Sequence, residues 1–170
     1  MGSERTAQSW PDLPQEVLMR GALDLARQAR DHGNHPFGAL LASADGRVLL
    51  EAENTVVTDR DCTGHAETNL IRLACRDLDR DVLASATLFT STEPCAMCAG
   101  AIYWAGVSQV VFGLREGELR ALTGNDPNNP TLALPCREVF ARGQRQISVI
   151  GPLLEDEARD VHAGFWRAPR

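Results

Sequence analysis

Lysine is missing from this sequence of 170 residues, and all seventeen basic side chains are arginine. The 23 acidic residues outnumber them, and the resulting net charge of −6 argues against a protein that grips nucleic acid by bulk electrostatics. No apolar run approaches the length of a membrane span, and the polar N-terminus has no apolar core like that of a signal peptide. These absences predict a cytoplasmic protein with no membrane partner.

Cysteine is scarce and its count is odd. Two of the five cysteines form a Cys-x-x-Cys motif, which favours reduced, metal-binding thiols over a disulfide framework. The length and a hydrophobic content of 44% suit one globular domain over residues 1–170. Within it, residues 1–14 read as a flexible arm, and residues 155–170 as a C-terminal helix and tail.

Hydrophobic spacing and turn residues predict an alternation of helices and strands. The expected helices cover residues 15–31, 65–76, 94–105 and 155–166, and the expected strands cover residues 37–44, 48–52, 86–91, 109–113 and 147–154. Asp45-Gly46 should close the first two strands into a hairpin. The later strand–helix–strand series favours parallel pairing. Residues 114–136 give no clear pattern beyond a loop at 125–130.

One histidine and two cysteines offer a metal site. His65, Cys95 and Cys98 supply nitrogen and sulfur ligands of the kind that Zn²⁺ prefers, and three protein ligands leave the fourth tetrahedral position open, as in catalytic sites. Cys95 and Cys98 should share one face of a helical first turn, where the helix N-terminus lowers thiol pKa. Glu67 would be the proton carrier beside the metal's water.

Two observations complicate this interpretation. Residues two apart do not share a face of a regular helix, so the spacing of His65 and Glu67 does not explain how both reach one site. In addition, Cys62-x-x-His65 together with Cys95-x-x-Cys98 could form a closed Cys₃His site of a non-catalytic, structural-zinc protein.

The His-x-Glu and Pro-Cys-x-x-Cys motifs resemble the signature of zinc-dependent nucleobase deaminases. Most of the chain, from Gln15 to Gly113, is similar to the cytidine-deaminase-like superfamily, and within it to bacterial guanine deaminases. The similar segments are residues 35–39, 61–67, 93–98 and 100–105. The resemblance implies a three-layer α-β-α sandwich around a five-stranded mixed sheet, usually as a homodimer. Residues 109–113 are nearer to tRNA adenosine deaminases, which share the zinc motif.

The resemblance also implies roles for individual residues. Asn54 would hydrogen-bond the base, and Phe37, Ala66 and Trp104 would line its pocket. Asp126 falls where guanine deaminases have an acidic substrate contact. In those enzymes the C-terminal tail covers the partner's active site, and here Trp166 could do so.

The expected activity is zinc-dependent hydrolytic deamination of a free aminated base. Guanine is the first choice, and cytosine or an s-triazine analogue are the others. The alternatives are a tRNA adenosine deaminase and the structural-zinc protein. The acidic balance favours a small-molecule substrate over nucleic acid.

Overall fold

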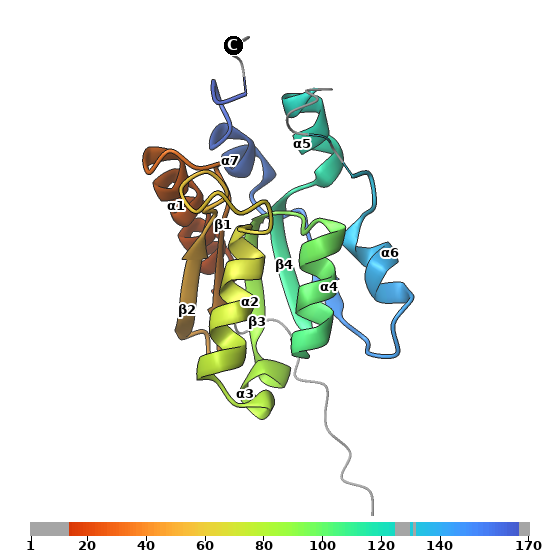
Figure 1. The fold of residues 1–170 in the computed structure, drawn as a ribbon. Coiled ribbons are helices and arrows are strands. Elements are labelled where there is room, and N and C mark those ends of the chain that lie inside the picture. The colour runs from red at the N-terminus through yellow and green to blue at the C-terminus, as the bar shows by residue number, and fades with distance from the viewer. Residues whose placement is uncertain (1–13, 125–129, 131, 167–170) are drawn as a thin grey trace, which may run out of the picture.

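A single mixed sheet forms the centre of the molecule (Figure 1). The computed structural model describes residues 14–124, 130 and 132–166. The strands are β1 (Gly38–Ala42), β2 (Val48–Glu53), β3 (Thr87–Thr92), β4 (Gln109–Leu114) and β5 (Ser148–Ile150), in the order β2-β1-β3-β4-β5. β1 is antiparallel to β2 and β3, whereas β3, β4 and β5 are parallel. The predicted five-stranded mixed sheet is therefore confirmed.

Helices cover both faces of the sheet. The described helices are α1 (Gln15–Asp31), α2 (Ala66–Asp77), α3 (Arg80–Ser85), α4 (Ala96–Ala105), α5 (Glu116–Thr123), α6 (Cys136–Ala141) and α7 (Glu155–Asp160). α2, α3, α4 and α6 bury apolar side chains on one face, and α1 and α7 do so on the other. In Figure 1, α2 and α4 lie in front of the sheet and α1 lies behind it. This is the predicted three-layer sandwich.

The N-terminal half follows the sequence pattern closely. α1 has the predicted bounds. All four of its predicted core residues are buried, namely Leu18, Ala22, Leu25 and Ala29. The hairpin of β1 and β2 turns at Asp45-Gly46, where Gly46 has a φ of 84°. Gly38 is needed for another reason, because a Cβ atom there would lie 2.4 Å from the backbone nitrogen of Ala26 in α1.

The C-terminal part departs from the prediction. β5 has only the bounds Ser148–Ile150 because Gly151 and Pro152 follow, and proline has no N–H for the ladder. The last helix, α7, ends at Asp160 instead of continuing to Trp166, and Gly164 with a φ of 71° lies in the turns beyond it. The helices α3, α5 and α6 were not predicted from the sequence pattern. The predicted N-terminal arm lies outside the described residues, apart from Pro14.

No helix in the described ranges combines the length and apolar character that crossing a membrane requires.

Candidate active site

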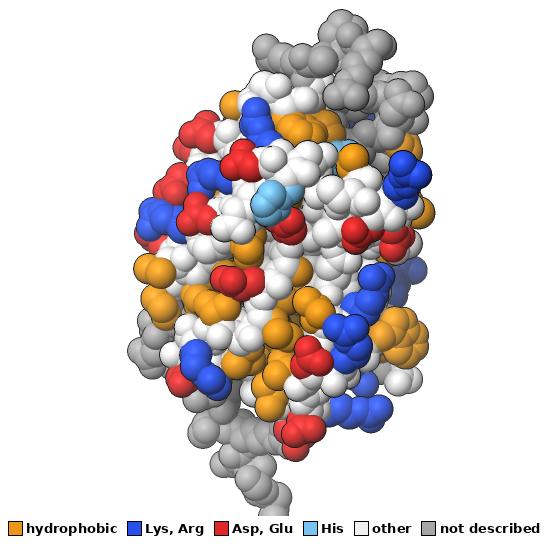
Figure 2. All heavy atoms as spheres, turned by 60° about the vertical axis from the view of Figure 1, so that its left-hand side comes forward, with side chains coloured by type: hydrophobic (Ala, Val, Ile, Leu, Met, Phe, Trp, Pro, Cys, Tyr) orange, Lys and Arg blue, Asp and Glu red, His pale blue; other side chains and the backbone are white. Residues whose placement is uncertain are grey.

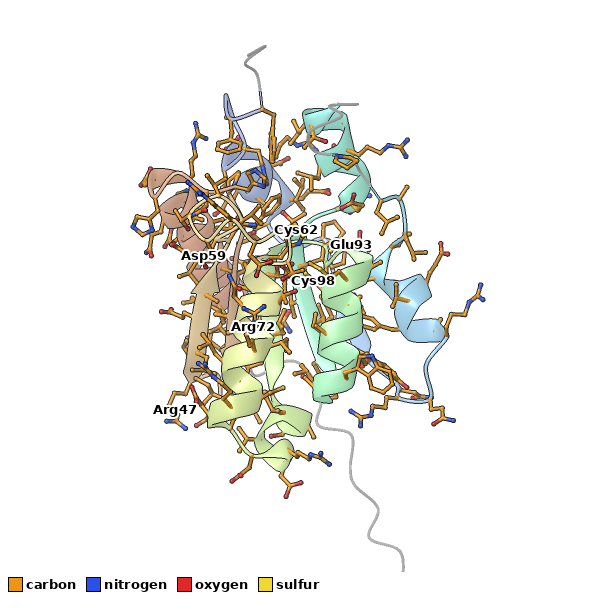
Figure 3. All side chains as sticks on the ribbon, in the orientation of Figure 1. Arg47, Asp59, Cys62, Arg72, Glu93 and Cys98 are labelled. Carbon is orange, nitrogen blue, oxygen red and sulfur yellow. The ribbon has the colours of Figure 1, made fainter. Side chains whose placement is uncertain are left out.

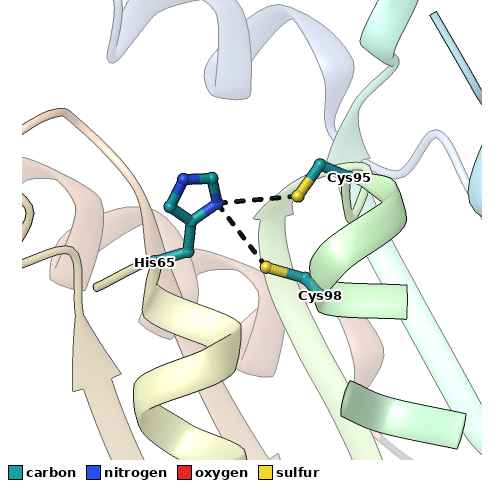
Figure 4. A group of neighbouring side chains, drawn as sticks. All are labelled: His65, Cys95 and Cys98. Atoms are coloured by element: carbon teal, nitrogen blue, oxygen red, sulfur yellow. Dashed lines mark hydrogen bonds between the residues drawn. The ribbon is translucent and has the colours of Figure 1, made fainter. Parts of the chain in front are cut away.

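Two helix N-termini meet beside the carboxyl end of β3 and bring three distant side chains together. His65 is the N-cap residue of α2, Cys95 is the N-cap residue of α4, and Cys98 lies in the first turn of α4. The Nδ1 atom of His65 lies 3.6 Å from the sulfur of Cys95 and 3.6 Å from that of Cys98 (Figure 4). The predicted convergence of two helix starts is thus present in the structure.

The spacing of these atoms suits zinc. Tetrahedral zinc with Zn–S and Zn–N distances of about 2.3 and 2.0–2.1 Å separates sulfur from nitrogen by about 3.5–3.6 Å. The ligand atoms of His65, Cys95 and Cys98 all lie within 4.8 Å of one another. Cys62 is exposed and is not a member of this group within the described part of the chain. The three-ligand arrangement therefore fits Zn²⁺ and leaves one coordination position for another ligand.

The two thiols of the cluster differ in pKa. A hydrogen bond from Cys98 lowers the pKa of the Cys95 thiol to about 4, and His65 adds to this effect. The pKa of Cys98 is raised because it donates that hydrogen bond and is buried. The Thr68 hydroxyl lies 3.3 Å from the Cys98 sulfur. The hydrogen bond to Cys95 raises the pKa of His65. Cys95 is therefore a ready thiolate ligand.

Glu67 is a buried carboxylate beside this cluster. Its Oε1 accepts a hydrogen bond of 2.8 Å from the hydroxyl of Thr90 on β3, and burial raises its pKa. His65 precedes α2 with an extended ψ of 148°, whereas Glu67 is already helical. The two residues are therefore not an i, i+2 pair of one regular helix, which explains how both reach the site.

Asn54, Phe37 and Ala66 surround the same end of the sheet. Asn54 is 1% exposed; its backbone N–H donates to the carbonyl of Phe37, and its Oδ1 accepts from Val56. Its Nδ2 has no hydrogen-bond partner among the described residues. An unpaired buried donor is costly, so this amide is suited to a ligand's acceptor atom. Ala66 is fully buried at the start of α2.

The C-terminal tail packs on its own chain. The ring of Trp166 lies 5.5 Å from that of His35 and 6.2 Å from that of Phe37. It also stacks on His162 and donates a 3.1 Å hydrogen bond to the Nδ1 of that residue. His35 is near enough to His65 for their charges to interact. Trp166 thus packs on Phe37 of its own chain, and its place over an active site stays a prediction.

His162 makes the tail sensitive to acid. Burial, and then the charge of Arg30, lower the pKa of His162 to about 4. The unfolded chain, with a histidine pKa of about 6.5, binds this proton first, so we expect stability to fall by about 3 kcal/mol as the pH drops from about 6.5 to 4. Urea unfolding between these pH values measures the loss. His162→Phe should flatten the dependence, and an unchanged slope would contradict the assignment.

Two predicted pocket residues do not join this group. Trp104 lies in the last turn of α4, the end far from the ligands, and is 80% exposed. Within this chain Trp104 does not reach the ligands, because it lies six residues beyond Cys98 along α4, and its role as a pocket wall stays a prediction. Asp126 lies outside the described residues.

Two further acidic residues, Glu93 and Glu116, lie near the site and were not predicted from the sequence. Glu93 is buried at the same end of α4 as Cys98 (Figure 3). Its two carboxylate oxygens accept from the backbone N–H groups of Glu116 and Cys136. Burial raises the pKa of Glu116 to about 7, with a further contribution from the charge of Cys95. Glu116 lies in residues 114–136, whose sequence shows no clear helix or strand pattern. Its position near Cys95 is therefore visible only in the folded structure.

Three clustered ligands, an open coordination position and a buried carboxylate, all at the carboxyl end of the central strand β3, are the arrangement expected of a metal-dependent hydrolase. The sequence model of the cytidine and deoxycytidylate deaminase zinc-binding region matches residues 14–114. The chain therefore belongs to this family of zinc-binding deaminases. The predicted family relationship and the zinc cofactor are confirmed.

The relatives differ in the substrate that their names state. A Schizosaccharomyces pombe protein described as a probable cytosine deaminase is 41% identical over 91% of this chain and 93% of its own length. A tRNA-specific adenosine deaminase from Bacillus subtilis is 33% identical over 91% of this chain and 90% of its length. A structure of guanine deaminase from Nitrosomonas europaea superposes with a TM-score of 0.70, at 28% identity over 88% of this chain and 82% of that one.

Proposed function

We propose that this protein hydrolytically removes the amino group of a free nucleobase or related heterocycle and releases ammonia. The observation that carries the proposal is the buried carboxylate of Glu67 beside a three-ligand cluster with an open position. The similarity to guanine deaminase supports guanine, and the similarity over most of the chain to the cytosine deaminase supports cytosine equally.

We assign the proton transfers to Glu67. Bound to His65, Cys95 and Cys98, zinc would lower the pKa of a water ligand and supply a nucleophile at neutral pH. Thr90 holds Oε1 of Glu67, so Oε2 would take a proton from that water and give it to a ring nitrogen of the base. A second transfer would protonate the departing amino group. Burial keeps this carboxylate basic enough to accept a proton.

We assign base binding to Asn54 and Phe37, with Ala66 at the start of α2 beside them. The unpaired Nδ2 of Asn54 can donate to a carbonyl or ring nitrogen of the base, and the Phe37 ring can lie against its apolar face. Trp166, packed on Phe37, would close this side and exclude water from the site. The ligand thiols must stay reduced, which supports action in the cytoplasm.

The alternative is deamination of adenosine in tRNA, which the similarity to the B. subtilis tRNA-specific enzyme supports. The charge distribution favours the small molecule. The net charge is −6, and the face in Figure 2 carries acidic as well as basic side chains. A screen of ammonia release from free bases, nucleosides and tRNA separates the two. Turnover of tRNA with no turnover of any free base would reject the proposal.

Asn54→Ala should lower kcat/KM for the preferred base by about 10²-fold or more, because the base loses a buried hydrogen bond in a site built to provide it. Zinc content should stay at the wild-type value, since Asn54 is not among the clustered ligands. Steady-state kinetics with metal analysis checks both. Asn69→Ala is a useful contrast, because the Asn69 amide has partners on Glu53, Thr55 and Gly64 and should mainly lose stability. Unchanged kinetics of Asn54→Ala would remove Asn54 from base binding.

We also propose that the protein is a homodimer in which a second copy covers the outer face of α4. That helix has no charged residue, yet Met97 is 37% and Trp104 is 80% exposed on it. A helix that is apolar all round is normally buried. Sedimentation velocity should find a dimer that Trp104→Glu dissociates, and a monomeric wild type would contradict this.

A further inference from the structure

Three strand ends form one row of side chains beside the cluster. β1 pairs with β2 so that Gly38 faces Glu53, and the next pair along, Phe37 and Asn54, continues with a 3.0 Å backbone hydrogen bond. β1 pairs with β3 so that Ala39 faces Thr90. Two residues further along this antiparallel register, Phe37 lies opposite Thr92. The row therefore runs from Asn54 through Phe37 to Thr92.

This row lies on the sheet face that carries α2 and α4. Side chains alternate between the two faces of a strand, so Thr92 shares a face with Thr90 and Leu88. Leu88 is buried in the core formed with α2 and α4, and Thr90 donates to Glu67 on α2. Thr92 is also only three residues before Cys95, at the end of β3 that leads to the ligands. Its side chain is thus on the Glu67 side of the sheet.

Within the described part of the chain, the Thr92 hydroxyl has no hydrogen-bond partner, unlike the other hydroxyls of β3. Thr87 donates to Gln109, Thr90 donates to Glu67, and Ser91 accepts from the backbone of Gly38. Thr92 is 3% exposed, and its Oγ1 has no partner among the residues that the structure describes. A buried hydroxyl without a partner costs about 1–3 kcal/mol, so its presence calls for a ligand.

We infer that Thr92 is a specificity-determining residue whose hydroxyl bonds a heteroatom of the heterocyclic substrate on the side opposite to Asn54. Neighbouring strands are about 4.8 Å apart, so the backbones at Asn54 and Thr92 are separated by about 10 Å, with Phe37 between them. A flat heterocycle lying against Phe37 can be bonded at both edges across this span. The Asn54 amide donates, whereas the hydroxyl can donate or accept. This inference rests on the proposed function of the same site.

The substitution Thr92→Val tests the inference, because it keeps the shape of the side chain and replaces its hydroxyl by a methyl group. We expect kcat/KM for the preferred base to fall by about 5- to 100-fold, with zinc content unchanged. Among bases that differ at single heteroatoms, the loss should be confined to those that keep the bonded atom. The melting temperature without substrate should stay the same or rise, because an unpaired buried hydroxyl has been removed.

Thr87→Val is the matched control. It makes the same change in the same strand, but the Thr87 hydroxyl is paired with Gln109 at the opposite end of β3. We expect it to lose stability and to keep kcat/KM. A Thr92→Val enzyme with wild-type kcat/KM on every base, or one with lowered stability and an equal loss for all bases, would overturn the inference. A wild-type enzyme that releases ammonia from no free base would instead reject the proposed function.

Discussion

Glu67→Gln should give a folded, zinc-loaded protein that no longer releases ammonia. Glutamine keeps the size of glutamate, and its amide oxygen can still accept the hydrogen bond from Thr90. It cannot carry a proton. General acid–base catalysis contributes about 10²–10⁴-fold, and one residue serves several transfers here, so we expect kcat to fall by at least about 10⁴-fold. Ammonia release under saturating substrate measures the effect.

The Glu67→Gln experiment has a simple control. Glu51→Gln makes the same chemical change at an exposed position of β2 and should leave kcat unchanged. Removal of the buried charge should also make the Glu67→Gln protein at least as stable as wild type, because the carboxylate is buried. Near wild-type turnover by the Glu67→Gln protein would exclude Glu67 from proton transfer.

Cys98→Ala should abolish both zinc binding and activity. Cys98 is fully buried, and its sulfur is one of only three clustered ligand atoms in the described chain. Loss of an outer-shell partner alone lowers metal affinity by about 10–100-fold, so loss of a direct ligand should exceed about 100-fold. Metal analysis after dialysis should find about one zinc per wild-type chain and none in the variant.

Cys62→Ala is the companion to Cys98→Ala. Cys62 is exposed and lies outside the cluster, so its alanine variant should keep zinc and turnover. A Cys62→Ala protein that loses zinc and unfolds would favour the closed structural site, in which Cys62 is the fourth ligand. Zinc retained by Cys98→Ala would reject the assigned ligand set altogether.

The elements that the sequence predicts well are those whose pattern is local. α1 has regular apolar spacing, and the hairpin has an Asp-Gly turn between two apolar segments. The ligands were also predictable, because the histidine and the Cys-x-x-Cys motif are chemically distinctive. The ligands come together because α4, which follows β3, lies next to α2. A sequence motif can indicate this proximity, but the order of the strands in the sheet determines it.

The features that the sequence could not predict depend on distant parts of the chain. The short helices α5 and α6 leave too few residues for a periodic pattern. The distance of Trp104 from the ligands depends on which end of α4 faces the site, and similarity of the motif does not predict that end. Glu67 reaches the cluster because His65 adopts an extended conformation before α2, whereas spacing counts treat both residues as helical.

Glu93 joins the starts of two helices, α5 and α6, beside the metal ligands. One oxygen of the Glu93 carboxylate accepts a hydrogen bond from the backbone N–H of Glu116, the first residue of α5. The other accepts from that of Cys136, the first residue of α6. The chain between Glu116 and Cys136 therefore leaves from and returns to one anchor beside the ligands. We expect changes between these two anchored helix starts to leave the metal ligands in place.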